Sequence, residues 1–205
     1  MNARLAVLAS GAGTNLQALM DDPRVAPAIA LVLSDRPEAM ALERARSRGI
    51  PTAVCERKDH PDRAAHDHAI RILLEEAGVE CLALAGYMRI VGPELIAAFP
   101  ERILNLHPAL LPAFPGMTSV ADALAWGVKV TGVTVHLVDE EVDHGPIVAQ
   151  EPVRVRSDDD LDTLLARVHE VEHRVFPQAV RALVEGRLKV EGRIVHVLEE
   201  EGGDR

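Results

Sequence analysis

The 205-residue sequence is poor in aromatic residues and has no excess of basic ones. Phe, Trp and Tyr together make up 2% of the chain, so aromatic platforms that stack nucleic-acid bases are not expected. The formal net charge of −10 also argues against a phosphate backbone as partner, because proteins bind such backbones with Lys and Arg. Nucleic acid is therefore excluded as the expected partner, whereas a small anion held at one local loop is not.

Cysteines and long apolar runs are also scarce. Cys55 and Cys81 are the only cysteines and lie in apolar, strand-like segments, which indicates buried free thiols in a reducing compartment. No apolar run approaches the ~20 residues that cross a membrane, and the N-terminus lacks the pattern of a secretory signal. We therefore expect a cytoplasmic protein that needs neither disulfides nor a metal and does not contact membranes.

Short apolar runs alternate with helical periods along the whole chain. Strands are expected at 4–10, 29–34, 52–55, 81–85, 102–106, 130–138 and 146–155, helices at 15–20, 38–48, 62–77, 93–99, 119–126 and 158–185, and a hairpin at 187–190 and 193–198. This alternation predicts an α/β fold, with a mostly parallel sheet flanked by helices on both faces. The length fits a single domain, with halves at 1–100 and 101–190 and a hairpin strand and frayed tail at 191–205.

A glycine-rich loop, Ser10–Asn15, follows the first expected strand and opens a helix, with Thr14 as its expected N-cap. Glycines allow the backbone to approach a ligand closely, and a helix start offers unpaired N–H groups to an anion. An ordinary tight turn is one interpretation. A dinucleotide site is another, but Leu16 replaces its third glycine, although Asp35 stands where a ribose-binding acid would lie. The phosphate of a mononucleotide-like substrate fits best.

A second polar group lies in the later half of the chain. Asn105 and His107 end a strand two residues apart, so their side chains point the same way. Both can donate hydrogen bonds to an oxygen that becomes negative in a transition state, and His also transfers protons near neutral pH. Asp143, if it lies near His107, would raise the pKa of the imidazole. From the residues alone, a capped strand end and a solvated loop acid remain alternatives.

The remaining histidines give weaker signals. The segment His169–His173 matches the zinc-peptidase pattern H-E-x-x-H on a helix, but without an evident third ligand we expect a chance match and no metal. His60, His66 and His68 surround an expected helix start and predict a solvated face. His136 lies on a strand and either faces the site or is a hydrogen-bonded core residue.

Several segments occur in an order that resembles the phosphoribosylglycinamide formyltransferase family, over roughly residues 3 to 190. They are SGAGTNLQ at 10–17, AGYMRI at 85–90, NLHPALLP at 105–112, Pro-Gly at 115–116, TVHLVDEEVDHG at 134–145 and Glu-His at 172–173. The resemblance implies a formyltransferase fold with a Rossmann-like N-terminal half. It also implies transfer of a formyl group from 10-formyltetrahydrofolate to the amine of glycinamide ribonucleotide, in de novo purine synthesis.

The same resemblance implies roles for individual residues. Gly13, Thr14 and Asn15 would hold the substrate phosphate and Glu172 the ribonucleotide; Arg63, Met88, Arg89, Ile90, Val91, Asn105, Asp139, Glu140, Glu141, Val142 and Asp143 would bind the folate. Asn105, His107 and Asp143 would be the catalytic residues, with His107 as proton donor. One departure is Val120, because relatives commonly carry a histidine at this position. The valine side chain cannot donate a hydrogen bond, so we expect weaker substrate contacts there.

Extra domains, surface charge and motif glycines distinguish the alternative functions from one another. A formyltetrahydrofolate hydrolase of this family would carry a further N-terminal domain, and a methionyl-tRNA formyltransferase would carry a further C-terminal domain and a basic surface. An NAD-dependent oxidoreductase would need the missing third glycine. A catalytically silent ligand-binding module would bind substrate without turnover. The sequence leaves open whether the protein is a monomer or a homodimer.

Overall fold

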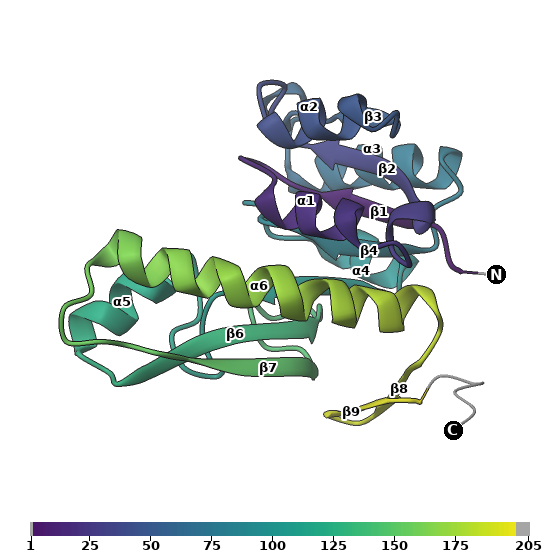
Figure 1. The fold of residues 1–205 in the computed structure, drawn as a ribbon. Helices are drawn as coiled ribbons and strands as arrows, with labels where there is room; N and C mark the ends of the chain where they lie inside the picture. The colour runs from purple at the N-terminus through teal and green to yellow at the C-terminus, as the bar shows by residue number, and fades with distance from the viewer. Residues whose placement is uncertain (1, 200–205) are drawn as a thin grey trace.

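The computed structural model describes residues 2–199, which form one nine-stranded sheet with helices on both faces (Figure 1). The strands are β1 (Leu5–Leu8), β2 (Ile29–Ser34), β3 (Thr52–Val54), β4 (Cys81–Leu84), β5 (Ile103–His107), β6 (Val130–Leu137), β7 (Ile147–Arg154), β8 (Leu188–Glu191) and β9 (Ile194–Val197). The helices are α1 (Thr14–Asp21), α2 (Met40–Ser47), α3 (Arg63–Glu76), α4 (Pro93–Ala98), α5 (Ser119–Trp126) and α6 (Leu161–Val184), with short 3₁₀ turns at Ala26–Ala28 and Arg57–Asp59.

The strand order is β3-β2-β1-β4-β5-β6-β7-β9-β8. All pairs from β3 to β5 are parallel, as the strand–helix alternation predicts for a Rossmann-like half. The pairs β5–β6 and β6–β7 are antiparallel, and β9 joins β7 in parallel while pairing antiparallel with β8. The expected mostly parallel α/β sheet is therefore confirmed, with antiparallel pairing confined to the later half.

Alternating side chains of the buried strands supply two apolar cores. On one face, Leu5 and Val7 of β1 pack with α1, α2, α5 and the long helix α6, whose Phe176 is fully buried. On the other face, Ala6 and Leu8 pack with α3 and α4. Helix α6 runs along both halves of the sheet, beside β6 and β7 and beside α1 (Figure 1). The two halves therefore share one core on the α6 face.

Strands β1, β2, β4 and β5 end at one edge of the sheet because they run parallel. Ser10 and Asp35 follow β1 and β2 at this edge, Gly86 follows β4, and His107 ends β5. Ligands of open α/β sheets bind at such carboxyl ends. The edge brings the glycine loop and the later polar residues into one region of the molecule.

Two local predictions were wrong. Gly13, and not Thr14, is the N-cap of α1, with a left-handed φ of 71°. A side chain at Gly13 would place a Cβ 2.7 Å from the Cα of Ala41, so close packing of α2 imposes glycine here. His66 is buried, because the start of α3 covers the chain after β3 and the imidazole Nε2 lies 2.9 Å from the Cys55 carbonyl oxygen.

Cys55 and Cys81 are buried and free, as expected. The terminal hairpin, expected at 187–190 and 193–198, is present at 188–191 and 194–197, and its first strand crosses the predicted boundary at residue 190. The predicted fraying of 199–205 falls, apart from Glu199, outside the described residues. Within residues 2–199 no helix has the length and apolar character to cross a membrane.

Candidate active site

A cavity of about 230 Å³ opens at the carboxyl edge, between the two halves of the sheet. Its walls come from the segment after β4, the end of β5 and the loop between β6 and β7. His107 and His136 line it. So do ten of the eleven predicted folate-binding residues, which are Met88, Arg89, Ile90, Val91, Asn105, Asp139, Glu140, Glu141, Val142 and Asp143. Arg63 is the exception, because its side chain lies beside Gly92 at the start of α3, outside the lining.

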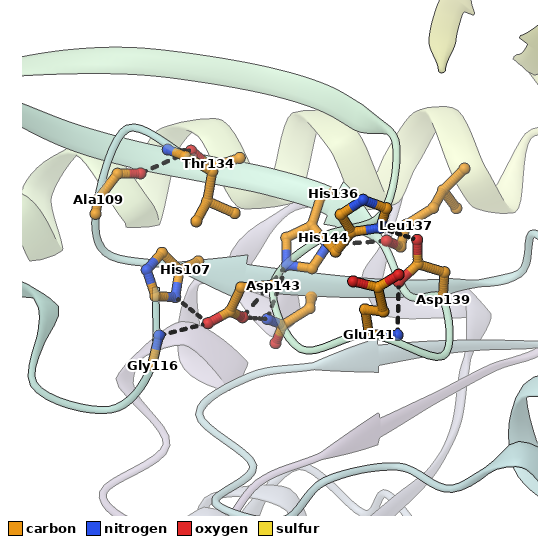
Figure 2. A network of polar contacts seen from close by, with 12 residues as sticks. His107, Ala109, Gly116, Thr134, His136, Leu137, Asp139, Glu141, Asp143 and His144 are labelled. Carbon is orange, nitrogen blue, oxygen red and sulfur yellow. Dashed lines mark hydrogen bonds and ion pairs between the residues drawn. The ribbon is translucent and has the colours of Figure 1, made fainter. Parts of the chain in front are cut away.

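Asp143 lies at the centre of a polar cluster at this cavity (Figure 2). Its Oδ2 accepts a hydrogen bond of 2.7 Å from the Gly116 N–H and lies 3.4 Å from His107 Nδ1. Its Oδ1 accepts from the Asn105 side-chain amide at 3.4 Å. The side chain is 9% exposed, which excludes the solvated-acid interpretation. The three predicted catalytic residues therefore meet, although they come from β5 and from a loop 36 to 38 positions later.

The electrostatics of this cluster differ in part from the sequence-based expectation. Burial lowers the pKa of His107 below its ordinary value, and the Phe114 carbonyl and Asp143, which both favour the imidazolium, offset only part of that effect. Asp143 does favour a higher pKa of His107, as expected, but burial has the larger effect and the pKa is lowered. Burial also opposes ionisation of Asp143, yet the Gly116 N–H and the neighbouring imidazoles keep the pKa of this carboxyl below its usual value.

Hydrogen bonds fix the orientation of the His107 ring. Nε2–H donates to the Phe114 carbonyl at 2.8 Å, which leaves Nδ1 toward Asp143. Phe114 is held in a left-handed conformation, φ 52°, on the proline-rich segment after β5. Thr134 supports the same segment by donating to the Ala109 carbonyl at 2.6 Å (Figure 2). This proline-rich segment, residues 108–116, therefore serves to orient the histidine.

His136 belongs to the cluster, although the predicted site did not include it. Its Nδ1–H donates to the Leu137 carbonyl at 2.8 Å, so its Nε2 accepts from the Asn105 side-chain amide at 3.1 Å. The ring is 2% exposed and lies 3.7 Å from Asp143 Oδ1. Both open alternatives for His136 are thus partly right, because it is buried and also faces the site. The alternation along β6 is the signal that indicated this residue.

The glycine loop has its own arrangement. The Ala41 N–H donates to the Gly11 carbonyl at 3.1 Å, and Arg44 Nε donates to the Ala12 carbonyl at 2.9 Å. Helix α2 therefore holds the carbonyl groups of the loop, while the first N–H groups of α1 have no partner within their own helix. Such groups, at the positive end of the helix dipole, suit an anion.

Asn15 and Glu172 meet beside this loop. The Asn15 amide donates to Glu172 Oε2 at 2.9 Å and so joins α1 to α6. Burial raises the pKa of Glu172, and the hydrogen bond from Asn15 opposes that shift. Asn15 Oδ1 is buried without a hydrogen-bond partner among the described residues. Two predicted ribonucleotide-binding residues are therefore in contact, and they offer an unused acceptor.

Two features that suggested other functions have structural roles. Leu16, at the third position of the dinucleotide motif, is fully buried in the core. Asp35, the candidate ribose-binding acid, is buried and accepts hydrogen bonds from Ser10 and Arg89. Both of its oxygens are therefore occupied within the protein, which removes the acid on which the dinucleotide interpretation depended.

The structure also shows the surroundings of the zinc-peptidase pattern and of Val120. The rings of His169 and His173 stack with centroids 6.3 Å apart, and among residues 2–199 no group of three His, Cys, Asp or Glu residues is arranged to hold a metal ion. Val120, in the first turn of α5, is 5% exposed and packs in the core. Its side chain does not line the cavity, so the predicted weakening of substrate contacts stays a prediction.

The fold and this cluster define the class of protein. A family model described as formyl transferase matches residues 3–180, and the chain belongs to that family. It is 41% identical over 184 residues to the phosphoribosylglycinamide formyltransferase of Bacillus subtilis, covering 88% of this chain and 94% of that protein. A crystal structure of glycinamide ribonucleotide transformylase 1 from Symbiobacterium toebii superposes with a TM-score of 0.93 at 46% identity, covering 97% of this chain and 95% of that one.

A longer relative carries the same unit. The chain is 43% identical over 203 residues to the trifunctional purine biosynthetic protein adenosine-3 of Bos taurus. The match covers 97% of this chain and 20% of the bovine protein, so the chain spans about a fifth of that relative. The resemblance to phosphoribosylglycinamide formyltransferases seen in the sequence is confirmed.

Proposed function

We propose that the protein transfers the formyl group of 10-formyltetrahydrofolate to the amine of glycinamide ribonucleotide, a step of purine synthesis. The observation that carries the proposal is the cluster in which Asn105 and His107 meet around Asp143 at the wall of the cavity. A half-buried amide donor beside an oriented imidazole suits the oxyanion of a formyl transfer. The proposed folate site is this cavity, whose apolar side chains Met88, Ile90 and Val142 suit a flat heterocycle.

The proposed ribonucleotide site is the glycine loop with Asn15 and Glu172. The start of α1 would hold the phosphate, as helix starts commonly do. The unpaired Asn15 Oδ1 suits a donor such as a ribose hydroxyl. Both proposed sites lie at the carboxyl edge of the sheet, as a transfer between the two substrates requires.

The proposed reaction follows from these positions. The amine nitrogen attacks the formyl carbon, and the carbonyl oxygen becomes an oxyanion. Asn105 and protonated His107 then donate to this oxyanion in place of their partners in the free protein, which are His136 for the amide and the Phe114 carbonyl for the imidazole. The bond from the formyl carbon to the folate nitrogen then breaks as that nitrogen takes a proton from the His107 imidazolium. The neutral His107 takes the proton that the attacking amine gives up, so the imidazolium is restored. No acyl-enzyme is needed, because the amine is itself the nucleophile.

The test is the absorbance change on deformylation of a 10-formyl folate, with and without glycinamide ribonucleotide. The proposal predicts a signal only when the ribonucleotide is present. A signal of equal size without it would instead indicate hydrolysis, and silence in both arms would refute formyl transfer. Nicotinamide-dinucleotide binding measured alongside should be undetectable, since the Asp35 carboxylate is engaged within the protein.

A further inference from the structure

Asp35 is the most deeply buried acid near the cavity, and formyl transfer as proposed does not use it. It follows β2 at the carboxyl edge, and its side chain is 0% exposed. A carboxylate in such a place is costly unless charged and polar partners surround it. The partners of Asp35 all lead to one segment, residues 86–91, which lines the cavity and is here named the cavity loop.

Two successive residues of the cavity loop are bound to this one acid. The Met88 N–H donates to Ser10 Oγ at 2.8 Å, and the Ser10 hydroxyl donates to Asp35 Oδ1 at 2.5 Å. Arg89 Nε donates to the other oxygen, Oδ2, at 2.7 Å. The main chain at Met88 and the side chain at Arg89 are therefore fixed from the same carboxylate, one through a hydroxyl and one directly.

The charge of Asp35 decides where the Arg89 guanidinium lies. An ionised carboxylate that is wholly buried needs a cation, and removing either partner of such a pair leaves an uncompensated charge. Arg89 is 43% exposed and lines the cavity, so it is a flexible surface side chain with one fixed end. Without Asp35 the guanidinium would be free to sample other rotamers, at an entropic cost when a ligand binds.

We propose that Asp35 is a positioning residue that preorganises the cavity loop for the formyl folate, by holding Met88 through Ser10 and Arg89 directly. The inference rests on the proposed function, because it takes the cavity as the folate site. It assigns to Asp35 a role in the binding of the formyl donor and none in binding a ribose. Ser10, the first residue of the glycine loop, makes a second contact with the cavity loop, because its N–H donates to the Gly86 carbonyl at 3.1 Å.

If the Asp35–Arg89 ion pair only stabilised the fold, its removal would lower stability and leave KM unchanged. The ion pair of Asp159 is a matched control for this alternative. Asp159 is 3% exposed and is paired with Arg167 just before α6, and it does not line the cavity. The variants Asp35→Asn and Asp159→Asn each remove the charge of one acid whose side chain has little exposure, with its arginine partner in place. In Asp35→Asn the amide oxygen can still accept a hydrogen bond from Ser10. The amide N–H₂ faces Arg89 Nε–H, and two donors cannot form a hydrogen bond, so the substitution breaks only the contact with Arg89.

The experiment measures KM for the formyl folate, KM for the ribonucleotide and the melting temperature in wild type, Asp35→Asn and Asp159→Asn. Loss of one charge-assisted hydrogen bond that orders the loop should raise KM for the formyl folate about tenfold in Asp35→Asn. KM for the ribonucleotide should stay within about twofold of wild type, because the glycine loop is held by α2. Asp159→Asn should lower only the melting temperature.

A second pair of variants covers the case in which Asp35→Asn folds poorly. Arg89→Gln leaves the carboxylate buried and unpaired and should lower the melting temperature, and Asp35→Asn added to it should restore much of that loss. KM for the formyl folate should be as high in the double variant as in Arg89→Gln alone, and no higher, because both substitutions break the same link. The proposal is overturned if Asp35→Asn leaves KM for the formyl folate unchanged, or raises both KM values equally. Wild-type inactivity would instead refute the proposed function.

Discussion

The glycine loop at 10–15 and the cluster around Asp143 are both at the carboxyl edge of the sheet, but they are built differently. The glycine loop presents main-chain groups, and its shape follows from the left-handed Gly13 and from α2 packed behind it. The Asp143 cluster presents side chains from β5, β6 and the loop after β6. One site therefore depends on local backbone geometry, and the other depends on contacts between distant segments. Substitutions should separate them, with losses in turnover at the cluster and losses in affinity at the loop.

The largest effect is expected for Asn105→Ala. Its amide donates to His136 and Asp143 and is the proposed oxyanion donor. Removing such a donor should lower kcat about 100- to 1,000-fold. Steady-state kinetics with both substrates and a thermal melt check this, since a folded variant with near-normal turnover would remove Asn105 from the chemistry.

Asp143→Asn should come next, with a loss in kcat of about 100-fold. Loss of the carboxylate removes the contribution that favours the imidazolium of His107, while burial continues to oppose it. The alkaline limb of the pH–rate profile, where loss of the imidazolium ends activity, should therefore move to lower pH, and turnover at neutral pH should fall. A pH–rate profile measures both changes, and an unshifted limb would argue that the two side chains are not coupled.

Gly13→Ala tests the glycine loop. The left-handed φ and the approach of the Ala41 backbone should destabilise the variant by about 1–3 kcal/mol, because the added Cβ has no room. KM for the ribonucleotide should rise about tenfold while kcat changes less, if the first N–H groups of α1 hold the phosphate. Gly11→Ala is the matched control, since a Cβ there meets nothing within 4 Å. Equal effects of both variants would contradict this account of the loop.

The smallest effect is expected at the C-terminal hairpin. Arg193 donates to the His144 carbonyl at 2.6 Å, and His144 Nδ1 lies 2.7 Å from Asp139 Oδ2 in the loop that carries Asp143. These groups are exposed, so Arg193→Ala should change kcat/KM by no more than about threefold. Lys189→Ala, on the same hairpin but paired with Glu191, is the control and should have no effect. A loss of tenfold or more in Arg193→Ala would mean that the hairpin holds the active-site loop firmly.

The sequence indicated the fold because its signals are mostly local. The bounds of β2 and α5 agree with the expected 29–34 and 119–126, since apolar runs and periodicity determine them. The cap at Gly13 was missed because its conformation is imposed by Ala41, which lies 28 residues away. The antiparallel pairing of β6 with both neighbours was likewise not encoded in a short motif.

The same division applies to the site. The pattern Asn-x-His at 105–107 could be found because two residues on one strand share a face. The roles of His136 and Asp35 depend on contacts with residues far away in the sequence. Asp35 was considered as a ribose-binding acid under the dinucleotide alternative, because a motif position carries no information about burial. Arg63 was expected at the folate site and lies outside the cavity lining, so its predicted role remains without support from the geometry.

The most direct test of the Asp143-centred cluster is an NMR titration of the His107 imidazole in wild type and in Asp143→Asn. The account predicts a pKa below the ordinary 6.5 in wild type, because burial dominates, and a still lower pKa in Asp143→Asn. The lower pKa in the variant would show that the carboxylate acts on the imidazole across the 3.4 Å that separates them. A pKa that is the same in both proteins, or higher in the variant, would contradict the central claim.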